Sequence, residues 1–98
     1  MVGDKTAIKV NIPLYFQRFT NGQDVVEVNG KTVGKCLHQL VKVYPGLEKE
    51  LFNQYGELDD YVGVYVNREM VCSWEKPLTI LVHDGDELSI IPMRVGGG

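Results

Sequence analysis

The chain has 98 residues, of which 44% are hydrophobic and 23% are charged, and its formal net charge is -3. This length fits one domain with a single modest core. The acidic balance, with no cluster of Lys and Arg, argues against a protein that binds the phosphate backbone of nucleic acids. No stretch resembles a signal peptide or a membrane span, so we expect a cytoplasmic protein without membrane contact.

The first predicted strand is "AIKVNIPLYF", residues 7–16, in which apolar and polar residues alternate. This period of two is typical of a half-buried strand. The residues predicted to point inward are Ile8, Val10, Ile12, Leu14 and Phe16. Pro13 cannot donate a ladder hydrogen bond, so the strand should bend or lose a pairing there. An Asn-Gly turn in "FTNGQ" and the apolar run "DVVEV" predict a second strand and a hairpin.

A change to helical spacing predicts one amphipathic helix that begins after residue 32. Its apolar positions are Val33, Leu37, Leu40, Val41 and Tyr44. Thr32 is a suitable N-cap, and Pro45-Gly46 should end the helix. The segment "LEKELF" predicts a further short helical turn.

Two cysteines, Cys36 and Cys72, lack the spacing of a disulfide framework or a metal site, and we expect free thiols. Cys36 falls at the edge of the buried helix face, where a small apolar filler is a better interpretation than a nucleophile. Trp74 is interpreted as a partly buried anchor, with a partner contact as the alternative.

The second half of the chain again shows the period of two. "YVGVYV", residues 61–66, predicts a strand with Val62, Val64 and Val66 inward, and a turn at Asn67-Arg68 leads into the short strand "EMVCSW". A turn at Asp84-Gly85 precedes a last strand over "ELSIIP", residues 87–92.

The order of these elements predicts an α+β fold with a mixed sheet of four to five strands and one main helix packed on one face. The β-grasp (ubiquitin-like) roll has this order, with the first and last strands parallel and side by side. We expect the folded domain to cover residues 1–92 and a flexible tail that ends in glycines to cover residues 93–98.

No known catalytic or metal-binding motif is found in the chain. Phosphate loops, G-x-S-x-G and C-x-x-C are absent. His38, on the polar helix face, and His83, beside a turn, have no spacing for a shared metal. The neighbouring carboxylates Asp59 and Asp60 are interpreted as solvated turn residues rather than as a catalytic pair.

The uncovered face of the sheet is the predicted partner surface. If the strands pack as described, one patch is shared by Tyr65, Ile91, Pro13, Tyr15 and Met93. An isoleucine, a methionine and tyrosines exposed together on a small domain mark an interface more often than incidental exposure.

Four segments together resemble the MoaD/ThiS family of ubiquitin-like sulfur carriers, and most closely its molybdopterin synthase small-subunit branch. They are "IKVNIPLYFQRFTNG", "VEVNGKTVGKCLHQLVKVYPGLEKELF", "GELDDYVGVYVN" and "DGDELSIIP" followed by the glycine run. The resemblance covers nearly the whole chain. The order and spacing of the segments, rather than any single one, make it specific.

The resemblance implies a carrier without a catalytic site or bound cofactor of its own. An adenylating enzyme of the MoeB/ThiF type would use ATP to activate the terminal glycine, and a sulfur donor would then convert it to a thiocarboxylate. The sulfur would pass to the molybdopterin synthase large subunit or to another sulfur-accepting enzyme. The reactive terminus would be Gly98, or Gly97 if a protease trims the third glycine, with Gly96 and Val95 completing the tail.

Three other functions fit the same residues. The thiocarboxylate could serve thiamine, cysteine or another thiolated product. The activated glycine could instead modify lysines of other proteins, as a ubiquitin-like modifier does. The domain could also be a β-grasp binding module with an inert tail.

Overall fold

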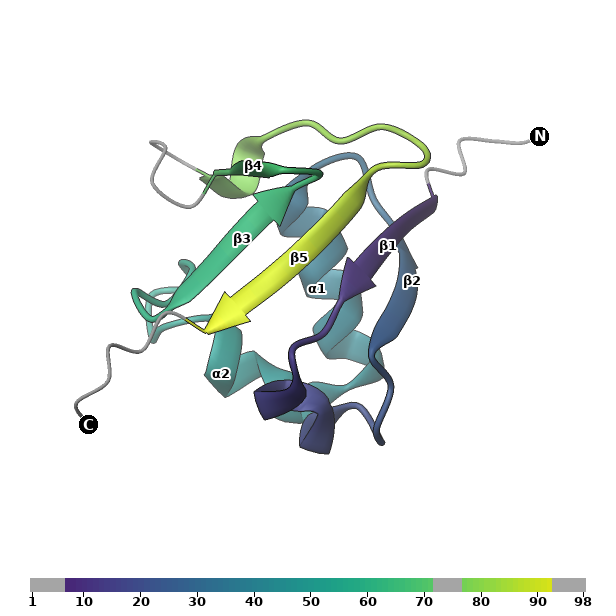
Figure 1. Cartoon of the computed structure of the whole chain (residues 1–98). Helices are drawn as coiled ribbons and strands as arrows, with labels where there is room; N and C mark the ends of the chain where they lie inside the picture. The colour runs from purple at the N-terminus through teal and green to yellow at the C-terminus, as the bar shows by residue number, and fades with distance from the viewer. Residues whose placement is uncertain (1–6, 72–76, 93–98) are drawn as a thin grey trace.

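The computed structural model describes residues 7–71 and 77–92, which form a sheet with helices on one face. The sheet order is β2-β1-β5-β3-β4 (Figure 1). The strand bounds are β1 Ala7–Asn11, β2 Val25–Asn29, β3 Val62–Val66, β4 Glu69–Met70 and β5 Glu87–Pro92. In the centre, β5 pairs in parallel with β1 and antiparallel with β3. This confirms the predicted β-grasp arrangement.

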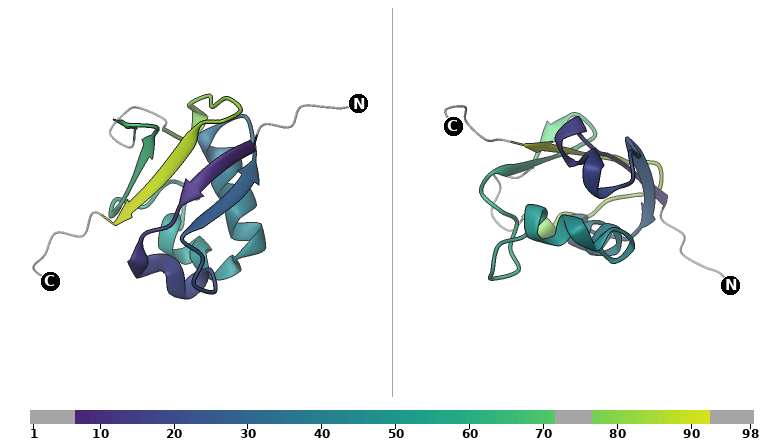
Figure 2. Two further views of the ribbon diagram at one scale, coloured as in Figure 1. Left: turned by 45° about the vertical axis from the view of Figure 1, so that its right-hand side comes forward. Right: turned by 90° about the horizontal axis from the view of Figure 1, so that it is seen from below.

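Helix α1, Val33–Val43, covers one face of the sheet (Figure 2). Its start is the predicted one, because the Thr32 side chain accepts a hydrogen bond from the Lys35 N–H at 3.1 Å and so satisfies one of the free donors of the first turn. After Tyr44 the chain continues as the 3-10 helix η2, Pro45–Leu47, and the short helix α2, Glu48–Leu51. The predicted helical turn in "LEKELF" is therefore confirmed.

The first strand is shorter than the alternation predicted. It ends at Asn11, and Leu14–Phe19 is the 3-10 helix η1. Pro13 has no N–H for the ladder, and its carbonyl instead accepts from the Phe16 N–H at 2.9 Å, which closes a helical turn. The inward placement of Leu14 was wrong, since its side chain is 81% exposed, whereas Phe16 is buried.

The predicted turns are all present. Asn21 and Gly22 adopt positive φ values of 55° and 82°, as a tight Asn-Gly turn requires. Asn67 has φ 57° and Gly85 has φ 93° at the two later turns. The short strand after Asn67 covers only Glu69–Met70; Cys72 and Trp74 lie outside the described residues.

The core lies between the sheet and α1. It is built from the inward residues of the strands, such as Ile8, Val64 and Leu88, and from the buried face of α1. Cys36 belongs to this core with no exposed surface, and burial raises the pKa of its thiol to about 11. This confirms the interpretation of Cys36 as a filler, since the thiolate needed for reactivity is disfavoured there.

The helices of the described segments include none that is long and apolar enough to cross a membrane.

Candidate functional site

The face of the sheet opposite α1 is exposed, and the strand register brings its residues together from all five strands. Val25 pairs with Asn11, Asn11 with Ser89, Ser89 with Tyr65, and Tyr65 with Met70. The Asn11 side chain donates a hydrogen bond to the Ser89 hydroxyl at 3.0 Å, which ties the parallel strands together at the centre of this row. The polar pair is therefore flanked by apolar residues toward both edges of the sheet.

A second, shorter row carries Ile91, which pairs with Gly63. Gly63 has no side chain to place beside Ile91, and Ile91 is 38% exposed. A shallow hollow of about 360 Å³ lies here, and its lining is Tyr65, Asn67, Arg68, Ser89 and Ile91. We call the whole face of the sheet opposite α1, with these rows and this hollow, the outer face.

Most charged residues of the outer face lie in a third row of paired residues. Lys9 pairs with Glu27 on one side and with Glu87 on the other. Opposite charges placed directly across strands favour one another, so Lys9 is balanced within the sheet. Arg68 lies at the other end, at the rim of the hollow.

The structure brings together part of the predicted partner patch and separates the rest. Tyr65 and Ile91 share the outer face, as predicted. Pro13 lies after the end of β1, half-buried, and Tyr15 is carried away by η1. The prediction for these two residues depended on a strand that continued to residue 16, so their place in this patch was wrong.

The remaining predicted site residues lie outside the described residues. They are Met93, Val95, Gly96, Gly97 and Gly98.

Val25 and Met70 are outer-face residues that the sequence analysis missed. Val25 is 42% exposed. Its position follows from the register of the hairpin, in which Val25 pairs with Asn11. The connection between the two strands contains η1, so the Asn-Gly turn alone does not give this register.

Tyr15 instead belongs to a second hollow, at the end of β5. This tail-exit hollow, of about 190 Å³, is lined by Tyr15, Tyr61 and Pro92 together with Phe16, Lys49, Glu50, Asp59 and Val62. The rings of Tyr15 and Phe16 meet edge to face with centroids 5.3 Å apart, and the Arg18 guanidinium lies 5.3 Å from the Tyr15 centroid. The chain therefore leaves the sheet toward residue 93 beside an aromatic surface.

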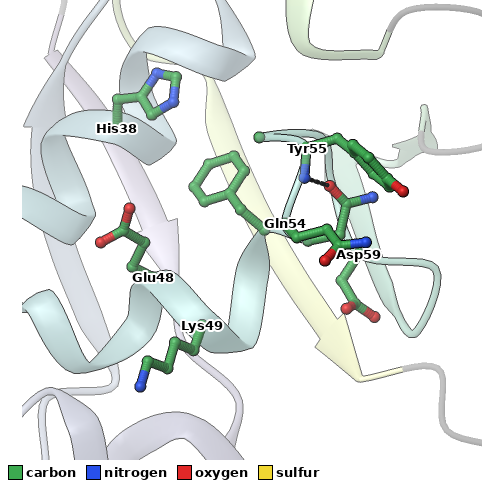
Figure 3. Close-up of a pocket in the computed structure, with 9 residues that line it drawn as sticks. His38, Glu48, Lys49, Gln54, Tyr55 and Asp59 are labelled. Carbon is green, nitrogen blue, oxygen red and sulfur yellow. Dashed lines mark hydrogen bonds between the residues drawn. The ribbon is translucent and has the colours of Figure 1, made fainter.

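A third and larger concavity lies on the helix side (Figure 3). This helix-side groove, of about 870 Å³, is lined by His38, Glu48, Lys49, Phe52, Asn53, Gln54, Tyr55, Gly56 and Asp59. The His38 ring stacks on Phe52 at 5.0 Å, and His38 is exposed as predicted for the polar helix face. Glu48 and Tyr55 lie on opposite sides of the groove, and Tyr55 is held by its N–H, which donates to the Asn53 side chain at 2.8 Å.

None of these surfaces has the arrangement of a metal or catalytic site. Within residues 7–71 and 77–92, no three His, Cys, Asp or Glu side chains gather around a point that could hold a metal ion. Asp59 is a turn residue, as predicted, because its side chain accepts a hydrogen bond from the Tyr61 N–H at 2.9 Å.

Comparisons with known proteins place the chain among small carriers and modifiers. The family model described as "ThiS family" matches residues 10–98. The chain is 33% identical to sulfur carrier protein CysO of Mycobacterium tuberculosis over 92 residues, which covers 92% of this chain and 98% of the relative. It is 38% identical to small archaeal modifier protein 1 of Haloferax volcanii over 73 residues, which covers 74% of this chain and 78% of that protein.

A solved structure shows the same similarity in three dimensions. In the crystal structure of the Amycolatopsis orientalis BexX/CysO complex, a chain that is 32% identical superposes with a TM-score of 0.82. The match covers 92% of this chain and 99% of the other.

Proposed function

The chain belongs to the ThiS family, and from this premise we propose that its C-terminal glycine is adenylated by a partner enzyme and then carries sulfur as a thiocarboxylate. The chain is a carrier and not an enzyme, as are the relatives named sulfur carrier and small modifier. The observation that supports the proposal most strongly is the extent of the family match, which runs through the glycine run to residue 98.

The terminal glycine needs a partner for a chemical reason. A free α-carboxylate has a pKa near ~3.5, so at neutral pH it is an anion and a poor electrophile. Attack of the carboxylate on ATP releases pyrophosphate and leaves an acyl-adenylate. A sulfur nucleophile then attacks the carbonyl carbon, the bond to the AMP oxygen breaks, and the chain keeps sulfur in place of one oxygen. In this scheme the partner uses ATP, and this chain supplies only the acyl group.

The outer face and the tail form one functional unit in this proposal. Ile91 on the outer face is one residue before Pro92, the last described residue. Residues 93–98 can span roughly 20 Å when extended, at ~3.3–3.6 Å each. A partner that docks on Tyr65 and Ile91 can therefore receive the terminal glycine in its own active site. The structure of a CysO protein in complex with BexX supports a partner that binds a carrier of this fold.

We propose an adenylating enzyme of the MoeB/ThiF type as the first partner and a sulfur-accepting enzyme as the second. Molybdopterin synthesis, with the synthase large subunit as acceptor, stays a prediction, because the relatives named above do not carry that name. Delivery of sulfur for cysteine, thiamine or another thiolated product is compatible with the same chemistry. Whether a trimming protease exposes Gly97 is part of the same prediction.

Protein modification is a second candidate, and the 38% identity to small archaeal modifier protein 1 favours it. The two functions share the acyl-adenylate and differ in the nucleophile. A sulfur donor gives the thiocarboxylate, whereas a lysine amine of another protein gives an isopeptide bond.

Intact-mass analysis tests the proposal. The chain is incubated with the adenylating enzyme of its own organism, ATP and a sulfide source, and the expected product shows one oxygen replaced by sulfur. A variant that lacks Gly97 and Gly98 is the control and should show no exchange of oxygen for sulfur. An unchanged mass of the full chain would contradict the proposal. The remnant Val95–Gly98, which trypsin leaves after cleavage at Arg94, would favour the modifier function if it were found on cellular lysines.

A further inference from the structure

The turn between β3 and β4 is held to the start of β5 through one side chain, Asn67. The Asn67 N–H donates to the Glu87 carbonyl at 2.7 Å, and the Glu87 N–H donates back to the Asn67 side-chain oxygen at 3.1 Å. The Asn67 side-chain amide donates to the Asp86 carboxylate at 3.2 Å. Asn67 has φ 57°, a left-handed conformation that asparagine tolerates better than most residues.

Asp86, which accepts the hydrogen bond from the Asn67 side chain, is itself held in place. The second carboxylate oxygen of Asp86 accepts the His83 N–H at 2.8 Å and lies 3.7 Å from the His83 ring nitrogen. The hydrogen bond from the His83 backbone lowers the pKa of Asp86, so the carboxylate is ionised at neutral pH. The turn that carries Asn67 is therefore anchored to a second turn rather than left free at the edge of the sheet.

The next residue, Arg68, is exposed at the rim of the outer-face hollow beside Tyr65 and Ile91. Arg68 forms no ion pair with another residue of the described segments. Lys9, also on the outer face, differs because it lies between Glu27 and Glu87 in the strand register. Arg68 is thus a cation placed next to an apolar hollow, and none of the carboxylates in residues 7–71 and 77–92 forms an ion pair with it.

We propose that Arg68 receives a carboxylate side chain of the adenylating enzyme when that enzyme docks on the outer face, and that Asn67 is the residue that positions Arg68. This inference rests on the proposed function and names a specific contact within it. A guanidinium group matches a carboxylate with two parallel hydrogen bonds. A partner that covers Tyr65 and Ile91 also removes water from this pair, which strengthens the attraction.

Positioning by Asn67 matters because the cost of ordering a loop on binding reduces affinity. A turn that is already fixed by three hydrogen bonds presents Arg68 in one place before the partner arrives. If Asn67 acts in this way, loss of its side chain should weaken docking only while Arg68 is present.

The test uses the full chain, the adenylating enzyme of its own organism and ATP, with carrier-dependent ATP–pyrophosphate exchange as the readout. Arg68→Gln should raise the KM for the carrier about tenfold, the effect of losing one charge-assisted contact of about 1.4 kcal/mol, with kcat unchanged. Lys42→Gln removes the same charge from an exposed position of α1 and is the matched control. It should change KM less than about twofold, because α1 covers the face of the sheet opposite the outer face.

Asn67→Gly tests the positioning role, because glycine keeps the left-handed backbone without strain and removes the side-chain hydrogen bonds. We expect KM to rise about fivefold in the wild-type background and to stay unchanged in the Arg68→Gln background, which is the signature of coupled residues. Thermal unfolding of each variant verifies that it is folded at the assay temperature.

Three outcomes would overturn the inference. Arg68→Gln could behave like Lys42→Gln, or Asn67→Gly could leave KM unchanged, or Asn67→Gly could raise KM equally in both backgrounds. Absence of exchange with the wild-type chain is a different result, since it overturns the proposed function and the inference with it.

Discussion

The outer face and the helix-side groove are built in opposite ways. The outer face gathers residues from all five strands, and each residue is placed by a ladder of backbone hydrogen bonds. The groove is formed almost entirely by one continuous segment, residues 48–59, with His38 added from α1. The outer face is therefore fixed by the fold as a whole, whereas the shape of the groove depends on local turns.

The two regions also differ in their relation to the tail. β5 carries Ile91 on the outer face and then ends at Pro92, so docking there brings the partner close to residues 93–98. The helix-side groove is larger, at about 870 Å³ against about 360 Å³, yet its floor is Phe52, a residue of the core. The proposed docking surface therefore holds the smaller of the two concavities.

The largest expected effect concerns the floor of the groove. Phe52→Ala should lower the free energy of unfolding by about 3 kcal/mol, because it removes a buried ring and leaves a cavity beneath His38. Urea unfolding measures this loss. His38→Ala removes the exposed ring of the same stacked pair and should cost less than about 1 kcal/mol. Equal stability of Phe52→Ala and the wild type would show that the groove is not built on the core.

A smaller effect is expected at the start of α1, which supports the sheet from the side opposite the outer face. Thr32→Ala should lower the free energy of unfolding by about 1 kcal/mol, since the Lys35 N–H loses its acceptor. Thr32→Ser keeps the hydroxyl and should stay close to the wild type. The KM for adenylation should be unchanged in both variants, and a rise in KM for Thr32→Ala would mean that the outer face is not independent of the helix end.

The smallest effect concerns Asp86, whose carboxylate accepts a hydrogen bond from Asn67, a lining residue of the outer-face hollow. Hydrogen bonds lower its pKa from the ordinary value of 3.8 in the folded chain. Its contribution to stability is therefore complete above the unfolded pKa and is lost as the pH falls through the folded pKa. The difference in unfolding free energy between the wild type and Asp86→Asn should be constant near neutral pH and shrink below about pH 4, with a size below about 1 kcal/mol. If this difference in unfolding free energy grew on acidification, it would contradict a pKa of Asp86 that is lowered by folding.

Most of the fold and the centre of the outer face could be predicted from the sequence. The period of two in residues 61–66 and 87–92 places Tyr65 and Ile91 on one face, and the order of elements brings the first and last strands together. The alternation and the order of elements each depend on many residues, so a single residue that departs from the pattern does not change the prediction.

The parts that could not be predicted depend on single local contacts. Leu14 and Phe16 continue the alternation of the first strand, but the hydrogen bond from the Phe16 N–H to the Pro13 carbonyl closes the first turn of the 3-10 helix η1 instead. In the groove, the Asn53 side chain accepts the N–H groups of Tyr55 and Glu57 at 2.8 and 3.0 Å. Such a turn leaves no periodic pattern in the sequence.

The measurement that tests the account most directly compares the two surfaces in the adenylation assay. Ile91→Asp places a charge on the outer face, and Tyr55→Asp places the same charge at an exposed position of the helix-side groove. We expect Ile91→Asp to raise the KM for the carrier about tenfold or more, because a buried apolar anchor of the interface is lost, and Tyr55→Asp to change it less than about twofold. An unchanged KM for Ile91→Asp, or a larger rise for Tyr55→Asp, would contradict the outer face as the docking surface.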